Sequence, residues 1–137
     1  MSNLFLVSCV SKKCQMPSPA RDLYVSPWFL KARAFVERSG MPWFILSAKH
    51  GLVVPDTTIQ PYDETLKNLS RDGRRAWAQR VISQMQSMLP QADTVIILAG
   101  MRYREFLMDY LQSTFPRVEV PMENLRIGEQ LRWLSQF

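Results

Sequence analysis

The stretch Thr94-Val-Ile-Ile-Leu-Ala-Gly100 decides the fold class. It is short, almost wholly apolar and rich in β-branched residues, which is typical of a strand buried on both faces of a parallel sheet. Residues 70–89 carry apolar side chains at helical spacing, with arginines in their first half, and residues 102–115 predict a second helix. Because parallel strands need a helix-length connection, this alternation predicts an α/β fold.

The remaining segments extend the same alternation along the chain. Apolar runs predict three further strands, at residues 3–9, 43–47 and 117–120. Ser26-Pro27 predicts the start of a helix that ends at Ser39-Gly40, and the tail predicts a short closing helix. Residues 1–137 are therefore expected to form a single domain. Its expected architecture has three layers, α/β/α, around a mostly parallel central sheet of about four strands.

Composition and charge place the chain among single-domain globular proteins. Apolar residues make up 47% of the 137 residues and charged residues 21%, which is enough apolar surface for one buried core. The net charge of +5 suits a polyanionic partner such as nucleic acid. It equally suits a surface whose charge only keeps the protein in solution.

Cysteine usage and hydropathy indicate a cytoplasmic protein. Cys9 and Cys14 are too few for a secreted disulfide framework, and their spacing is not that of a zinc site. Residues 4–10 are apolar but too short to span a membrane, and Met1-Ser2-Asn3 lacks the positive charge of a signal peptide. We therefore expect no membrane association, no metal and no cofactor.

In sheets of this kind, ligands bind beyond the carboxyl ends of the parallel strands. Three predicted strands run there into polar segments, at residues 8–13, 47–51 and 99–102. Periodicity stops at residues 48–52, where a loop is expected to leave the sheet, and residues 53–69 are expected to be ordered loop with one or two short elements. That loop is expected to bring Pro61-Tyr62-Asp63 to the same cleft.

Four motifs resemble a family of bacterial and phage proteins known as a domain of unknown function. They are Ser8-Cys9-Val10-Ser11-Lys12-Lys13, Ser47-Ala48-Lys49-His50-Gly51-Leu52, Pro61-Tyr62-Asp63 and Ile127-Gly128-Glu129-Gln130-Leu131. The resemblance covers almost the whole chain. In that family the first strand typically ends in Pro-Cys-Gly followed by a lysine, whereas Ser8 and Val10 stand here in place of the proline and the glycine.

A more distant resemblance concerns the same strand end, its lysine and the later Tyr24. Together they are similar to a domain of archaeosine-type tRNA modification enzymes, which is itself similar in fold to uracil-DNA glycosylases. The resemblance implies a uracil-DNA-glycosylase-like fold and chemistry directed at a nucleobase. A shared fold does not transfer a reaction, so individual residues must carry the functional argument.

Three residues are candidate catalytic groups: Asp63, His50 and Lys13. Asp63 can orient water or stabilise an oxocarbenium-like sugar, or else it caps a short helix over residues 63–66; Asp56 is the alternative carboxylate. His50, the only histidine, can act as a general acid or as a donor to developing negative charge, or else it bonds a backbone carbonyl. Lys13 can bind phosphate or, when desolvated, attack a sugar carbon.

Candidate substrate-binding residues fall into three chemical groups. Lysines and the start of a helix can hold phosphate, tyrosines can stack on a base, and small polar or thiol side chains end the strands. The candidates are Cys9, Ser11, Lys12, Tyr24, Ser47, Lys49, Tyr62, Gly100 and Arg102. Cys9 is interpreted as a packed thiol rather than a nucleophile, because no base is paired with it in the sequence.

These residues favour an enzyme that acts on a nucleobase. The leading hypothesis is hydrolysis of an N-glycosidic bond in DNA, which is favoured over RNA as partner, with modified bases of phage genomes as candidate substrates. The alternative is a non-catalytic module that recognises the phosphates of a nucleic acid or a nucleotide through Lys12, Lys13, Lys49 and Arg102. A protein-interaction partner would instead expose a contiguous apolar patch.

Overall fold

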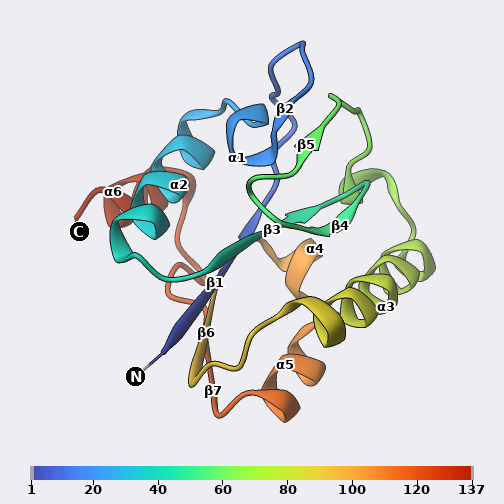
Figure 1. Cartoon of the computed structure of the whole chain (residues 1–137), viewed down its shortest axis with the longest axis vertical. Coiled ribbons are helices and arrows are strands. Elements are labelled where there is room, and N and C mark those ends of the chain that lie inside the picture. The colour runs from blue at the N-terminus through green and yellow to red at the C-terminus, as the bar shows by residue number, and fades with distance from the viewer. Residues whose placement is uncertain (1, 137) are drawn as a thin grey trace.

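The computed structural model describes residues 2–136, and a five-stranded sheet runs through its middle (Figure 1). The strands lie in the order β4-β3-β1-β6-β7. Their bounds are Asn3–Ser8 for β1, Trp43–Ser47 for β3, Gly51–Val53 for β4, Thr94–Leu98 for β6 and Arg117–Glu119 for β7. All of them are parallel except β4, which is antiparallel at one edge. The prediction of a mostly parallel sheet is therefore confirmed.

The three apolar runs predicted as buried strands form the centre of this sheet. β1 pairs with β3 on one side and with β6 on the other, so that Val7 lies opposite both Ile45 and Leu98. All three side chains are fully buried. Both faces of these strands are covered, which is why their sequences are apolar without alternation.

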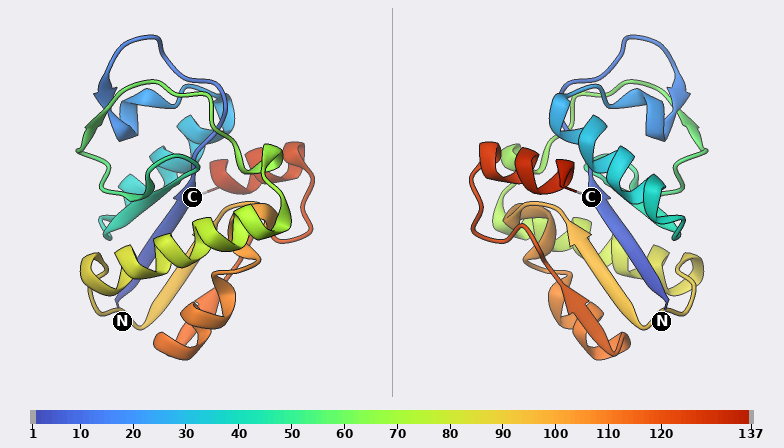
Figure 2. Two further views of the ribbon diagram at one scale, coloured as in Figure 1. Left: turned by 90° about the vertical axis from the view of Figure 1, so that its right-hand side faces the viewer. Right: turned by 90° about the vertical axis from the view of Figure 1, so that its left-hand side faces the viewer.

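Helices lie on both faces of the sheet (Figure 2). α2 (Pro27–Ser39) and α6 (Ile127–Ser135) pack against each other on one face, and α3 (Arg71–Met88) lies on the other. The predicted start and end of α2 are confirmed. Ser26 Oγ accepts a hydrogen bond from the N–H of Phe29 at 3.1 Å, and Gly40 ends the helix with a φ of 71°.

The segment after β6 forms two short helices, so the single helix predicted over residues 102–115 is wrong. α4 covers Met101–Arg104 and α5 covers Met108–Thr114. The buried side chain of Arg104 turns back to the end of β6, where its Nε donates to the carbonyl of Ala99 at 2.9 Å. This hydrogen bond joins the end of α4 to the end of β6. The next helix, α5, begins only at Met108.

The predicted departure of the chain from the sheet after β3 is also wrong, because β4 returns along β3 after a tight turn. Gly51 lies opposite Ser47 in this pairing and has a φ of 77°, a conformation that strains any residue with a side chain. A Cβ at this position would also meet the side chain of Gln84. A three-residue strand is too short to show a period, so only its pairing reveals it.

Short elements gather near the carboxyl ends of β1 and β3 (Figure 1). β2 (Ser18–Pro19) and β5 (Thr58–Ile59) pair antiparallel, α1 covers Ala20–Leu23, and the 3-10 helix η1 covers Leu66–Asn68. β5 and η1 are the short elements that the sequence predicts in the long segment before α3. β2 and α1 were not predicted, since elements this short have no measurable periodicity.

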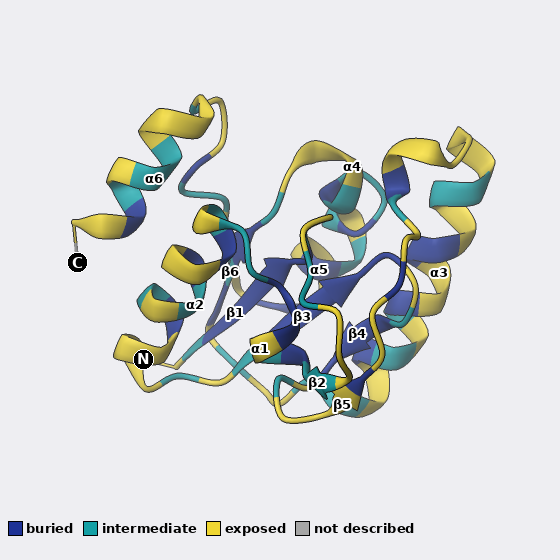
Figure 3. Ribbon diagram, turned by 90° about the horizontal axis from the view of Figure 1, so that it is seen from above, coloured by how far each residue is buried: buried dark blue, intermediate teal, exposed yellow. Residues whose placement is uncertain are grey.

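The buried residues form one core around the sheet (Figure 3). The helices turn their buried positions toward it and their exposed positions outward (Figure 3). In the described part of the chain, no helix combines the length and the apolar character needed to cross a lipid bilayer. Cys9 and Cys14 are both free thiols, and Cys9 is buried.

Candidate functional site

The site begins where the two central strands β1 and β3 end side by side. Cys9 follows β1, and its backbone N–H donates to the carbonyl of Leu46 in β3 at 2.9 Å. The N–H of Ala48, just after β3, points back to the Cys9 sulfur at 3.4 Å. The same sulfur lies 3.2 Å from the hydroxyl of Tyr103 in α4. Cys9 is thus a packed thiol at the junction of three segments, as its position in the sequence predicts.

A buried network of hydroxyl groups forms the centre of the site. The Tyr62 hydroxyl lies 2.5 Å from the hydroxyl of Tyr24 and 2.7 Å from Ser47 Oγ. Burial raises the pKa of both tyrosines, so both remain neutral phenols near neutral pH. Tyr24 is fully buried, which leaves no face of its ring for the base that the sequence-based hypothesis would stack on it. Tyr24 is therefore a core residue whose hydroxyl group takes part in the buried network.

Lys13 stands over the ring of Tyr62. Its Nζ lies 4.3 Å from the ring centroid and donates to the carbonyl of Ser11 at 3.2 Å. The backbone at Lys13 is fixed by an antiparallel bridge to Tyr24. Burial lowers the pKa of the Lys13 ammonium, and the negative charges of Asp63 and Glu64 act in the opposite direction. Lys13 is therefore a partly desolvated cation held on an aromatic face.

His50 packs against the same tyrosine. Its ring is perpendicular to that of Tyr62, with centroids 5.5 Å apart, and its backbone N–H donates to Ser47 Oγ at 3.0 Å. Burial lowers the pKa of His50, and the neighbouring positive charges of Lys49 and Arg80 lower it further. The imidazole is therefore neutral at neutral pH. It suits a hydrogen-bond donor or a base better than the protonated acid that the sequence suggested.

The carboxylates next to Tyr62 are exposed. The negative charges of Asp63 and Glu64 both act to raise the pKa of Lys13, against the effect of burial. The short helix that follows is capped by Thr65, whose Oγ1 accepts from the N–H of Lys67, so the structural role considered for Asp63 is wrong. The alternative carboxylate, Asp56, forms an ion pair with Arg21.

A groove of about 380 Å³ opens beside His50, between the β3–β4 turn and α3. Lys49 and Arg80 supply positive charge to its lining, and Glu64 supplies a carboxylate. Arg80 Nη2 donates to the carbonyl of Lys49 at 2.7 Å, which fixes the turn on the helix. The groove thus has a basic side formed by Lys49 and Arg80, whereas Tyr62, His50 and Lys13 are not part of its lining.

Some predicted site residues lie apart from this cluster. Ser11 and Lys12 are exposed, and their backbone carbonyls accept hydrogen bonds from Lys13 Nζ and from the N–H of Val25. Gly100 lines a different cavity, of about 180 Å³, near the start of α4, and Arg102 is exposed on that short helix. Residues 2–136 contain no group of three or more His, Cys, Asp or Glu side chains placed to hold a metal ion.

Sequence reasoning missed several residues that build the site. Trp77 in α3 donates its Nε1 hydrogen to the carbonyl of Ser47 at 2.9 Å, and its ring is perpendicular to that of Tyr103. Glu64 and Arg80 complete the charged surroundings of Lys13 and His50. Trp77 and Arg80 lie one helical turn apart on α3, which is the only signal in the sequence that could have grouped them.

These features define an α/β protein with a mostly parallel sheet and a polar cluster at the carboxyl ends of its central strands. The chain belongs to the Family of unknown function (DUF6884), which matches residues 4–136. It is similar to the uncharacterized protein YfjM of Bacillus subtilis (strain 168), with 27% identity over 120 residues that cover 78% of this chain and 75% of the relative. Comparison with the solved structures gave no significant match. The expected membership of a family of unknown function is confirmed.

Acidification is expected to destabilise the protein through His50. The folded protein lowers the pKa of His50 below its usual 6.5, so below that pH the unfolded chain binds more protons. The stability that neutral His50 contributes is present above this pH and is lost as the pH falls through the folded pKa. Urea unfolding at about pH 7.5 and about pH 5 should therefore show wild type losing stability relative to His50→Gln. A difference that is independent of pH would contradict this expectation.

Proposed function

We propose that the chain is a cytoplasmic enzyme that acts on a nucleobase and hydrolyses an N-glycosidic bond in DNA. The observation that carries the proposal is the arrangement around Tyr62, where Lys13 lies over the ring and His50 packs perpendicular to it, with Asp63 next in the chain. A cation, a neutral imidazole and a carboxylate thus come to the carboxyl end of the sheet, where ligands of parallel sheets bind.

Each of the three groups suits one part of this reaction. The bond between the sugar C1′ and the base nitrogen breaks with its electron pair going to the base. Water then adds to C1′ and loses one proton, which the departing base takes up. The Asp63 carboxylate would stabilise the oxocarbenium-like sugar and orient the water. The neutral His50 imidazole would donate a hydrogen bond to the departing base, and the Lys13 ammonium would bind a phosphate of the substrate.

The basic groove beside His50 supports a polyanionic substrate. Lys49 and Arg80 line it, and their positive charges add to the effect of burial in lowering the pKa of His50. A strand whose phosphates contacted these two residues would place a nucleotide next to Tyr62. The net charge of +5 is consistent with such a partner.

The sequence resemblance supports the same chemistry. The strand end at Cys9, the following lysines and Tyr24 are similar to a domain of archaeosine-type tRNA modification enzymes, and through it to uracil-DNA glycosylases. Here Tyr24 holds the Tyr62 hydroxyl, so the matching tyrosine is part of the site's scaffold. We propose a uracil-DNA-glycosylase-like relationship on this basis.

The proposal is tested by measuring base release from DNA. Single- and double-stranded oligonucleotides carrying different modified bases are incubated with the full chain, and the released base is separated by chromatography. Release from at least one substrate is expected. Tight DNA binding with no release from any of these substrates would instead favour the non-catalytic module, which the exposed basic groove also suits.

DNA binding is expected to depend on the basic groove and on salt. Replacing Lys49 and Arg80 together with Ala should reduce the slope of log affinity against log salt by about 2, because each phosphate contact contributes about 0.9. The matched control replaces Arg117 and Arg132, which are exposed on β7 and α6, and should leave the slope nearly unchanged. Equal effects of the two double variants in fluorescence anisotropy would place the phosphate contacts elsewhere.

A further inference from the structure

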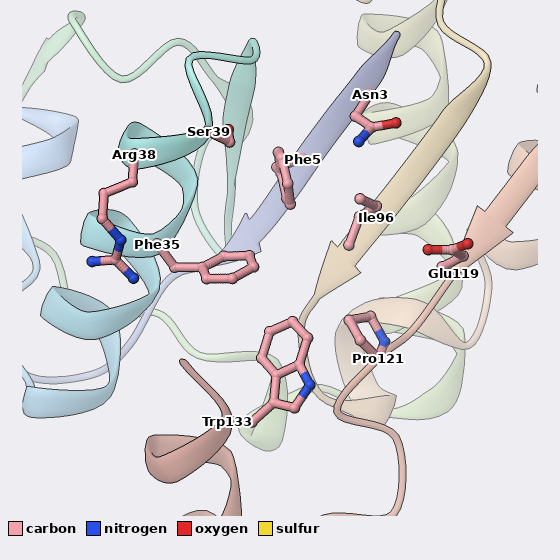
Figure 4. A pocket seen from close by; sticks show the side chains of 9 residues that line it. All are labelled: Asn3, Phe5, Phe35, Arg38, Ser39, Ile96, Glu119, Pro121 and Trp133. Carbon is pink, nitrogen blue, oxygen red and sulfur yellow. The ribbon is translucent and has the colours of Figure 1, made fainter. Parts of the chain in front are cut away.

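A second groove, of about 440 Å³, lies on the face of the sheet that α2 and α6 cover (Figure 4). Its floor is a row of side chains across three neighbouring parallel strands, in which Phe5 pairs with Ile96 and Ile96 with Glu119. Phe35 of α2 and Trp133 of α6 stand beside this floor (Figure 4). The volume is within the range of small-molecule sites, roughly 300–1,000 Å³.

This groove is separate from the site around Tyr62. Asn3 and Phe5, which line it, belong to the first half of β1, whereas Cys9 follows the carboxyl end of that strand. At about 3.3 Å per residue, Phe5 and Cys9 are about 13 Å apart along the strand. The residues that line the two sites do not overlap.

Aromatic rings fix the shape of the apolar part of the groove. Phe35 stands edge-on to Phe5 with centroids 5.9 Å apart, and its ring is 4.9 Å from that of Trp133. Ile96 in the floor is only partly buried, although Val95 and Ile97 on either side of it are buried. A partly exposed apolar floor between fixed rings suits a flat ring that stacks or packs edge-on.

Opposite charges stand on opposite sides of this floor. Arg38 comes from the last turn of α2 and Glu119 from the edge strand β7, and the apolar side chains lie between them (Figure 4). One guanidinium N–H of Arg38 donates to the carbonyl of Leu134 at 3.3 Å. Because a guanidinium has five N–H groups, others remain to bind an anion. The Glu119 carboxylate can only accept hydrogen bonds while ionised, and the Asn3 amide lies on the same side.

We propose that this groove binds a nucleoside monophosphate whose base carries an exocyclic amino group. The base would lie on Ile96, its amino edge would donate to Glu119, and its phosphate would pair with Arg38. A carboxylate is the acceptor that amino groups of bases meet in proteins, and arginine matches phosphate in a two-pronged geometry. The proposal does not depend on the function proposed above, because it uses none of the residues around Tyr62.

Isothermal titration of the full chain with cytidine and guanosine monophosphates tests this site. Both are expected to bind, and uridine monophosphate, which lacks the amino group, should bind about tenfold more weakly. Arg38→Met and Glu119→Ala should each weaken binding of cytidine monophosphate by about tenfold. Both side chains are exposed, so folding should be unaffected, and circular dichroism checks this. Trp133→Phe should remove the ligand-induced change in tryptophan fluorescence.

The matched control is Arg132→Met, which removes an exposed arginine of α6 outside the groove and should bind like wild type. The proposal is overturned if millimolar nucleotide gives no heat, or if the Arg38 and Glu119 variants bind as wild type does. If cytidine binds as tightly as its monophosphate, the phosphate makes no contribution to binding, and the proposal is overturned as well. A dimer in analytical ultracentrifugation that Arg38→Met dissociates would show that a second copy of the chain covers the groove instead.

Discussion

Replacing Trp77 with Ala is expected to lower the free energy of unfolding by about 3–5 kcal/mol. The Trp77 side chain is 5% exposed, and it joins α3 to two parts of the site. Its Nε1 hydrogen bonds the carbonyl of Ser47 at the end of β3, and its ring packs against Tyr103. The substitution therefore leaves both a cavity and an unpaired buried carbonyl. Urea unfolding followed by circular dichroism measures the loss.

The conservative variant Trp77→Phe separates these two contributions. It keeps a six-membered aromatic ring but removes the hydrogen-bond donor and part of the indole volume, so a loss of about 1–3 kcal/mol, smaller than that of Trp77→Ala, is expected. A Trp77→Ala variant no less stable than Trp77→Phe would contradict the packing argument. A Trp77→Phe variant as stable as wild type would mean that the Ser47 carbonyl finds another donor.

The central strands and long helices could be predicted because their environments impose a recognisable pattern of apolar residues on the sequence. Ile45 and Leu98 belong to strands covered on both faces, so apolar residues follow one another without interruption. Ser26 and Gly40 mark the ends of α2 through backbone requirements that few residues satisfy. Each of these signals is local, and a local signal can be recognised in a single sequence.

The remaining elements depend on contacts between distant segments. β4 is a strand because Gly51–Val53 pairs antiparallel with the edge of β3. α4 ends at Arg104, whose side chain hydrogen bonds the carbonyl of Ala99. β2 and β5 each consist of two residues and are held by their mutual pairing. None of these contacts leaves a periodic trace in the sequence, because they are made by tertiary structure.

The same distinction applies to the candidate site. His50, Ser47 and Cys9 could be placed at one edge of the sheet because parallel strands align their carboxyl ends. The sequence could not show that the Tyr62 hydroxyl bonds Ser47, or that Trp77 lies beneath the end of β3. Those contacts bring the segments that carry Ser47, Tyr62 and Trp77 together into one cluster with a buried centre.

If the chain cleaves an N-glycosidic bond, Asp63→Asn is expected to lower the rate of base release by about 10²–10³-fold with little change in DNA binding. The amide occupies nearly the same space but carries no charge to stabilise a positively charged sugar. Asparagine also holds water less effectively, since one oxygen is replaced by a donor. Single-turnover base release and fluorescence anisotropy measure the two quantities separately.

Glu64→Gln is the matched control, because Glu64 adjoins Asp63, is likewise exposed, and likewise acts on the charge of Lys13. Both variants remove one negative charge from the surroundings of Lys13, so both lower the pKa of its ammonium further. If Asp63 only keeps Lys13 charged, the two variants should lose activity equally. If the Asp63 carboxylate faces the sugar, Glu64→Gln should lose less than about tenfold while Asp63→Asn loses far more. Equal losses of activity in the two variants would contradict a direct role of Asp63 in the reaction. They would mean that Asp63 acts only through the charge it places near Lys13.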